Sequence, residues 1–283
     1  MRIANIVSPG AEYLTPAPAD VAPDATSELV VIGLEIPMAT DPLRLGLKDL
    51  IYVEAAVRAE RLGFDAVFVN TVADYGLPLM REAVSIPVVG AGEVGFAAAA
   101  AGGRPFAIVT VWPSITQISY DRVLRDTGLA GQCRDIRYVL EEPELATLGG
   151  GRAVMDAVDR PGTEIAHRVR HSCVQAEAGG AEAIVLGCTC MAALTEWLQE
   201  AVRIPVINPL REGHQAAEAA VRAVARGERA PHTPNPDSVA RLLAAVAAMT
   251  PMGASLPSNW IATDTADADC GDVCAVLPDV ALA

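Results

Sequence analysis

Cys188 and Thr71 are the residues best placed to do chemistry, because they end two copies of one sequence segment. AERLGFDAVFVNT (residues 59–71) aligns with AEAGGAEAIVLGC (residues 176–188), so that Thr71 corresponds to Cys188. Each copy contains a helix end, a glycine and a short apolar strand, which indicates a duplicated βαβ unit. Ligands of such folds bind at the carboxyl ends of the strands. We therefore expect Thr71 and Cys188 to face one cleft.

Cys188 is predicted to follow a strand and to precede a helix. First-turn N–H groups and the helix dipole favour negative charge there, which lowers a thiol pKa and produces a base or nucleophile. The alternative is an inert buried cysteine, which is common for this residue type. Gly187 allows close backbone approach, and Thr189 offers a hydroxyl. Cys190 could relay a proton, form a resting disulfide or pack against the following helix, and we favour packing.

Strands and helices alternate along most of the chain. Short, β-branched apolar runs such as AVFVN and AIVLG are typical of parallel strands covered on both faces. The pattern predicts an α/β fold with two pseudo-symmetric, doubly wound parallel-sheet halves and an active site in the cleft between them. Strands are expected at residues 2–7, 29–34, 66–70, 87–90, 105–112, 133–139, 183–187 and 205–208, and helices at 47–62, 77–84, 96–101, 117–127, 162–178, 191–202 and 215–226.

These elements divide the chain into three parts. Residues 1–115 are expected to form the first half and residues 116–230 the second, with part of the C-terminal helix crossing back to the first half. Residues 231–283 change in composition and predict one more helix and an irregular acidic tail.

Composition excludes several classes of function. The net charge of −14 opposes nucleic-acid binding, which needs a basic face. No apolar run is long enough for a membrane span, and the N-terminus lacks a signal-peptide pattern. Six cysteines in 283 residues are too sparse for a disulfide scaffold. We expect a cytoplasmic enzyme with reduced thiols, a small-molecule substrate, no metal and a homo-oligomeric state.

Other candidate sites are weaker. Cys188 and Cys190 with Cys270 and Cys274 could form a zinc or redox tetrad, but the spacing is unlike that of zinc fingers. GAGEVG (residues 90–95) has dinucleotide-binding spacing without the acidic residue that should end the next strand. His167 and His171 are interpreted as part of a solvated face. His214 and Glu93 are candidate cleft residues, whereas Asp74 is expected to cap the next helix.

Two motifs together resemble the Asp/Glu/hydantoin racemase superfamily, and most closely its hydantoin-racemase-like branch. VLGCTCMA is similar to the segment around the family's second cysteine. NTVADYGLPLMREAVSIPVVGAGE is similar to the segment around its first cysteine, and MRI and FAIVT also fit. The resemblance extends from residue 1 to about residue 227. It implies a cofactor-independent enzyme in which two thiols act on opposite faces of the substrate's α-carbon.

The resemblance also implies roles for individual residues. Cys188 matches the second catalytic cysteine, and Thr71 stands where the family has its first. The residues expected to contact substrate through their match to the family are Ser8, Pro9, Asn70, Val72, Thr110, Ser114, Gly187 and Thr189. Cys190 occupies the position where amino-acid racemases have His or Glu, and it is therefore a possible auxiliary thiol.

Thr71 departs from the family pattern, because a hydroxyl does not replace a thiol as acid or base without activation. The sequence predicts a racemase or isomerase that acts at the α-carbon of a small carboxylate, hydantoin or related carbonyl compound. One alternative is one-thiol chemistry, as in the family's arylmalonate decarboxylase branch: decarboxylation, C–C lyase action or a covalent thiol adduct. Another is an inactive relative that binds a ligand or a partner protein.

Overall fold

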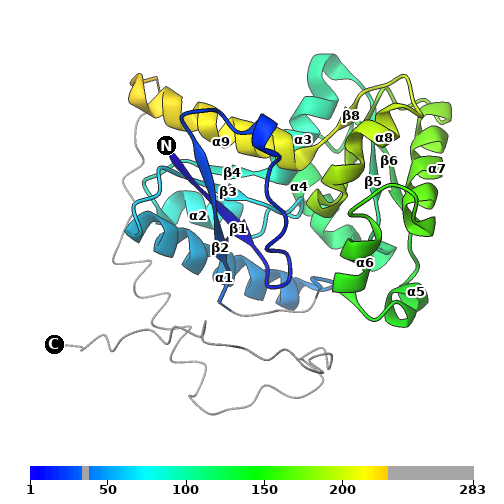
Figure 1. Ribbon diagram of the computed structural model, residues 1–283, viewed down its shortest axis with the longest axis horizontal. Coiled ribbons are helices and arrows are strands. Elements are labelled where there is room, and N and C mark those ends of the chain that lie inside the picture. Colours follow the sequence, from blue (N-terminus) through cyan, green and yellow to red (C-terminus); the bar gives the residue numbers. More distant parts are fainter. Residues whose placement is uncertain (34–37, 229–283) are drawn as a thin grey trace, which may run out of the picture.

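The computed structural model describes residues 1–33 and 38–228, which form two four-stranded parallel sheets (Figure 1). The first sheet has the order β2-β1-β3-β4 and the second the order β6-β5-β7-β8, so that the two halves repeat one topology. This arrangement confirms the predicted α/β fold. The strands are β1 (Arg2–Val7), β2 (Thr26–Val31), β3 (Ala66–Val69), β4 (Val88–Gly90), β5 (Phe106–Thr110), β6 (Cys133–Tyr138), β7 (Ala183–Leu186) and β8 (Val206–Ile207).

The strands at the centre of each sheet are buried on both faces. Every residue of β3, β5 and β7 is buried, as expected of apolar runs without alternation. The covering helices are α1 (Pro42–Arg61), α2 (Leu77–Ala83), α3 (Ala91–Ala100), α4 (Gln117–Asp126), α5 (Glu142–Thr147), α6 (Gly151–Ala157), α7 (Glu164–Ala178), α8 (Thr195–Gln199) and α9 (Pro209–Ala225).

Helices α3 and α9 each pack on the sheet of the other half. Phe96 of α3 lies in one apolar cluster with Phe106 and Val185 of the second sheet. Leu210 and Ala217 of α9 pack with residues of the first sheet, and Figure 1 shows α9 beside β3 and β4. This reciprocal exchange ties the two halves together and places the carboxyl ends of both sheets near each other.

Several boundaries differ from the predicted ones. Helix α1 begins at Pro42, because Asp41 caps it by accepting a hydrogen bond from the Arg44 N–H at 2.9 Å. The predicted helix at 191–202 is a 3-10 helix, Thr189–Leu194, followed by the short α8. Two short helices, α5 and α6, were not predicted, since neither has an apolar period long enough to stand out.

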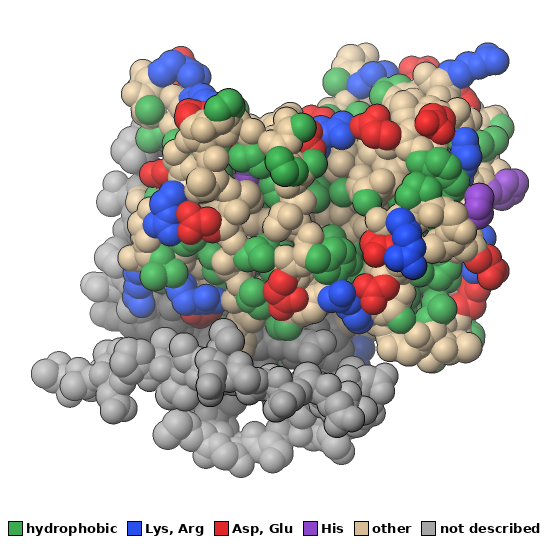
Figure 2. All heavy atoms as spheres, viewed as in Figure 1, with side chains coloured by type: hydrophobic (Ala, Val, Ile, Leu, Met, Phe, Trp, Pro, Cys, Tyr) green, Lys and Arg blue, Asp and Glu red, His purple; other side chains and the backbone are tan. Residues whose placement is uncertain are grey.

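The predicted terminal helix and tail, including Cys270 and Cys274, lie outside the described residues. On the face shown in Figure 2, acidic and basic side chains of the described residues are interspersed. Within residues 1–33 and 38–228, no helix is long and apolar enough to cross a membrane.

Candidate active site

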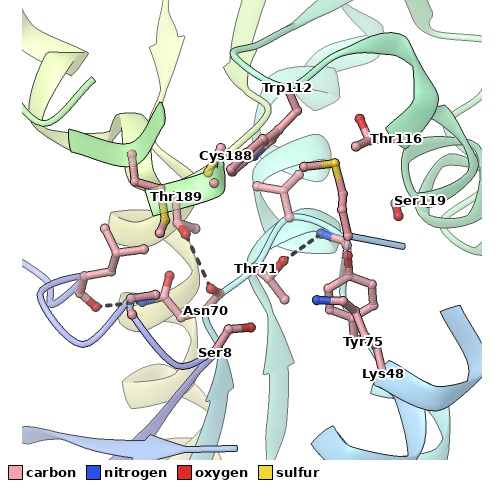
Figure 3. Close-up of a pocket in the computed structure, with 18 of the residues that line it drawn as sticks. Ser8, Lys48, Asn70, Thr71, Tyr75, Trp112, Thr116, Ser119, Cys188 and Thr189 are labelled. Atoms are coloured by element: carbon pink, nitrogen blue, oxygen red, sulfur yellow. Dashed lines mark hydrogen bonds between the residues drawn. The ribbon is translucent and has the colours of Figure 1, made fainter. Parts of the chain in front are cut away.

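A cavity of about 480 Å³ is lined by loops from both halves of the molecule. Its size suits a small organic ligand. Thr71 follows β3 and Cys188 follows β7, and the two lie at matching ends of equivalent strands in this one cavity (Figure 3). The residues predicted from the family match that line it are Ser8, Pro9, Asn70, Thr71, Val72, Gly187, Cys188 and Thr189.

The two strand ends are joined directly across the halves. The Thr189 hydroxyl donates a hydrogen bond of 3.4 Å to the backbone carbonyl of Asn70, which precedes Thr71. Thr189 is 2% exposed, so this contact is shielded from water. The segment that carries Cys188 is thereby held against the segment that carries Thr71.

The backbone before Cys188 is held in place by the buried hydroxyls of Thr110 and Tyr120. The Tyr120 hydroxyl lies 2.7 Å from the Thr110 hydroxyl and donates to the Gly187 carbonyl at 2.8 Å. A Cβ atom at Gly187 would lie 2.5 Å from the Cβ of Thr110, so that only glycine permits this approach. Thr110 therefore supports the site without lining the cavity, in contrast to its predicted substrate contact.

Cys188 and Cys190 are joined by a disulfide in this structure. Cys190 is 2% exposed and lies in the apolar core of the second half, so that it both packs, as favoured from the sequence, and bonds to its neighbour. Its backbone N–H also lies 3.2 Å from the sulfur of Cys188. Because only a thiolate acts as base or nucleophile, chemistry at Cys188 requires reduction of this bond.

The N-terminal loop forms one wall of the cavity and is held by hydrogen bonds to its Leu14 and Gly10 carbonyls. The side-chain amides of Asn5 and Asn70 both donate to the Leu14 carbonyl, at 3.0 and 2.7 Å. From the second half, Arg152 donates to the Gly10 carbonyl at 2.7 Å and stacks over Tyr13. Residues from both halves therefore fasten this loop over the site.

The Thr71 side of the cavity is rich in polar groups. The Thr71 hydroxyl accepts a hydrogen bond of 3.4 Å from the Ala73 N–H. Tyr52 and Tyr75 pack together nearby, with ring centroids 5.4 Å apart. Burial raises the pKa of Tyr75 to about 12 and also raises that of Tyr52. Both hydroxyls therefore stay protonated at neutral pH.

Sequence reasoning missed several of the lining residues. Most of them come from elements without a motif: Lys48, Tyr52, Trp112, Thr116, Ser119 and Arg152. Tyr75 lies inside the family-like segment at residues 70–93 but was not singled out, and Lys48 is the single lysine of the chain. The others could not be placed without the tertiary fold.

Three further residues that were predicted to contact substrate, Ser114, Glu93 and His214, lie away from the cavity. Ser114 is exposed at the start of the 3-10 helix before α4, and Thr116 and Ser119 line the cavity instead. Glu93 forms an ion pair with Arg81 and accepts from the Gly90 N–H at the start of α3. These placements correct the predicted substrate contacts, because the 3-10 helix leaves Ser114 exposed and Glu93 of α3 is paired with Arg81.

His214 is fully buried in α9, with its ring edge-on to Phe68 and its Nδ1 3.4 Å from Glu218. Burial lowers the pKa of His214. The predicted cleft position is wrong for this residue, because α9 crosses to the first sheet and carries His214 into its core.

Asp74 caps α3 instead of the next helix in the sequence. Its carboxylate accepts from the backbone N–H groups of Gly92 and Glu93 at 2.8 and 2.6 Å. Burial raises the pKa of Asp74 to about 8, against the effect of these two bonds. Asp74 thus ties the loop after Thr71 to α3.

In the described part of the chain, no group of three or more His, Cys, Asp or Glu side chains could hold a metal ion.

Comparisons with known proteins agree with this geometry. Residues 13–217 match the family model for Asp/Glu/Hydantoin racemase. A hydantoin racemase of Rhizobium meliloti is 30% identical over 173 residues, which cover 59% of this chain and 64% of that protein, less than two thirds of its length. A hydantoin racemase of Paenarthrobacter aurescens is 26% identical over 227 residues, which cover 78% of this chain and 91% of that protein.

Solved structures show the same likeness. Allantoin racemase from Klebsiella pneumoniae superposes with a TM-score of 0.66 and 26% identity, over 80% of this chain and 89% of that one. Arylmalonate decarboxylase shares the fold, with a TM-score of 0.54 and 19% identity over 78% of this chain and 92% of that one. Because the family match spans more than half of the residues, the chain belongs to the Asp/Glu/hydantoin racemase family.

Proposed function

We propose that this protein racemises a small cyclic ureide of the hydantoin type, without a cofactor, at the carbon next to a carbonyl group. The observation that carries the proposal is that Cys188 and Thr71 lie at equivalent strand ends and line the same cavity. The hydantoin and allantoin racemases among its relatives supply the substrate class.

Racemisation at such a carbon needs a proton to leave one face and another to arrive on the opposite face. The reduced Cys188 thiolate would take the proton, and the electron pair of the C–H bond would move into the adjacent carbonyl as an enolate. Hydroxyl and N–H donors of a water-poor cavity stabilise this charge where it develops. The Thr71 hydroxyl lies at the cavity wall and accepts its hydrogen bond from the Ala73 N–H, so that its own proton is suited to this role.

Asn70 supports a substrate that carries N–H groups. Its amide nitrogen is bound to the Leu14 carbonyl, whereas its Oδ1 has no hydrogen-bond partner among the described residues. Asn70 is 4% exposed and lines the cavity. A buried acceptor without a donor costs about 1–3 kcal/mol. A ring N–H of a hydantoin would satisfy this oxygen, and a simple carboxylate would not.

A second candidate function follows from Thr71. With a thiol on one side only, the site could protonate an enediolate that forms by loss of CO₂ from a malonate. This one-sided reaction needs no proton carrier at Thr71, because the carboxylate leaves as CO₂ in place of a proton.

Solvent exchange distinguishes the two reactions from an inactive relative. The reduced protein is incubated in D₂O with single enantiomers of 5-substituted hydantoins and with aryl malonates, and products are followed by NMR and polarimetry. Deuterium uptake with inversion supports racemisation, and CO₂ release supports decarboxylation. Either activity should be lost in Cys188→Ala and kept in Cys133→Ser, whose half-buried thiol lies on the edge strand β6. Inversion that persists in Cys188→Ala contradicts the proposal.

A further inference from the structure

Lys48 is the only lysine in 283 residues, and the other 20 basic residues are arginine. Arginine keeps its proton under all conditions at which proteins are folded, whereas a lysine amine can give up and take back a proton. Among the 21 lysine and arginine residues, Lys48 is therefore the one whose side chain can readily exchange a proton. The position of Lys48 in the fold indicates what this amine does.

Lys48 lies in the first half of α1 and points into the cavity. Lys48 is 7% exposed, and its Nζ lies 5.0 Å from the centre of the Tyr75 ring. Figure 3 shows Lys48 alongside Tyr75 on the Thr71 side of the cavity, with Cys188 and Trp112 across from them. The amine therefore lies on the side where the family's first thiol is replaced by Thr71.

The segment that carries Lys48 is held rigidly against both halves. The next residue, Asp49, accepts two hydrogen bonds from Arg122 of α4, at 2.9 and 2.8 Å, and one from the Gly76 N–H at 2.7 Å. Arg122 also donates to the Ala73 carbonyl at 2.8 Å. These contacts place the helix turn of Lys48 beside the loop of Thr71, and a proton carrier needs such a defined position.

The other groups on this side are poor proton carriers. Threonine and serine hydroxyls are far too weakly acidic. Burial raises the pKa of Tyr75 to about 12 and raises that of Tyr52 as well. Arg152 also lines the cavity, but guanidinium does not release its proton, and its side chain pairs with Asp156. Lysine is the side chain here that combines a titratable amine with a flexible stem.

We propose that Lys48 is the second proton carrier of this site and acts on the substrate face opposite Cys188, in place of the family's first thiol. This inference rests on the proposed racemisation. In one direction the Cys188 thiolate takes the α-proton, and the Lys48 ammonium donates a proton to the opposite face of the enolate. The products are a Cys188 thiol, a neutral Lys48 amine and the inverted C–H centre.

In the other direction the Lys48 amine takes the α-proton and the Cys188 thiol returns one. The thiolate–ammonium and thiol–amine forms contain the same number of protons, so each turnover leaves the enzyme ready for the other enantiomer. Once the disulfide has been reduced, the turnover itself needs no oxidant, reductant or further reactant. The ammonium also offers a positive charge near the enolate oxygen as charge develops.

Measuring α-proton exchange and inversion of configuration separately distinguishes the roles of Lys48 and Cys188. In Lys48→Met and Lys48→Arg, inversion should fall by about 100-fold or more. Both variants should still exchange the α-proton of one enantiomer with D₂O, with retention, through Cys188. Cys188→Ala should likewise exchange the α-proton with retention, but only for the other enantiomer and through Lys48. Wild-type inversion in Lys48→Arg would show that only the positive charge matters, and would overturn the inference. Loss of both exchanges in folded Lys48→Met would assign Lys48 to binding and overturn it as well.

A single lysine also permits a direct measurement on the wild-type protein. Lysine labelled with ¹³C at Cε gives one side-chain signal, which needs no assignment, and its titration is followed by NMR in the reduced enzyme. The midpoint should coincide with one limb of the pH–rate profile for inversion. A midpoint that matches neither limb would contradict the inference. Failure of the proposed function itself appears differently, as the absence of Cys188-dependent exchange in the wild type.

Discussion

The Thr189 hydroxyl donates to the Asn70 carbonyl across 119 positions of sequence, and this contact joins the two strand ends that carry Cys188 and Thr71. Thr189 follows Cys188 directly, and Asn70 precedes Thr71 directly. The bond lies at the base of the cavity, where both residues are buried. The spacing of the two chemically distinct walls thus depends on contacts between the halves.

Because Cys188 carries a thiol and Thr71 a hydroxyl, we expect their mutation to have unequal effects on activity. We expect Cys188→Ala to reduce kcat/KM for inversion by about 1000-fold or more, because it removes the thiol that we propose as a proton carrier. Thr71→Ala should reduce it by about tenfold or less, because it removes one neutral hydrogen-bond donor or acceptor. Steady-state kinetics on reduced protein test both. A loss in Thr71→Ala as large as that in Cys188→Ala would assign the Thr71 hydroxyl a direct part in proton transfer.

The disulfide predicts a requirement for reductant. Oxidised protein contains no thiolate at Cys188, so dithiothreitol should raise activity by about tenfold or more. Cys190→Ser cannot form the bond, and its activity should be independent of reductant. Cys133→Ser serves as the control that keeps the requirement. Free-thiol counts and intact mass report the state of the bond, and full activity of protein shown to be oxidised would refute this prediction.

Asn5 and Asn70 form a matched pair for testing substrate binding. Both donate to the Leu14 carbonyl, but only Asn70 lines the cavity. Each change to alanine should lower the free energy of unfolding by about 1–3 kcal/mol, since a buried hydrogen bond is lost. Only Asn70→Ala should also lower kcat/KM by about tenfold or more. Equal kinetic losses in the two variants would show that Asn70 acts only by holding the loop.

The ion pair of Arg122 and Asp49 predicts a stability effect. Both side chains are largely shielded, at 15% and 18% exposure. Arg122→Met leaves the carboxylate without its cation and should lower the free energy of unfolding by about 3 kcal/mol. Arg125→Met, on the same helix with a 69% exposed side chain, should change it by less than about 0.5 kcal/mol. Urea unfolding measures both, and similar values for the two variants would contradict the assignment.

His214 predicts a loss of stability in acid. Burial lowers its folded pKa below the value of about 6.5 of an unfolded histidine, so the unfolded chain binds the additional proton first as the pH falls. The free energy of unfolding contributed by His214 is therefore present above pH 6.5 and decreases as the pH falls through the lower, folded pKa. His214→Phe should flatten the curve between pH 7.5 and 5 relative to wild type. The exposed His171, changed to Gln, should not alter the slope.

The fold class and the two central residues followed from local sequence. Strands β3 and β7 are continuous apolar runs and β1 is mostly apolar, and the limits of all three agree with the predicted ones to within one residue. The internal duplication then related Thr71 to Cys188, because parallel strands of equivalent units end at the same edge. The loop at Ser8 and Pro9 was expected at the site through its resemblance to the family, and it lines the cavity.

The tertiary structure alone decided which other side chains reach the cavity. Lys48 lines it because of the helical phase of α1 and the Asp49–Arg122 contact, which no local pattern encodes. His214 was misplaced because the exchange of α9 between the halves depends on packing between residues far apart in sequence. Strand ends are specified by short-range periodicity, whereas the lining of a cavity between two sheets depends on long-range packing of loops and helices that have no period of their own.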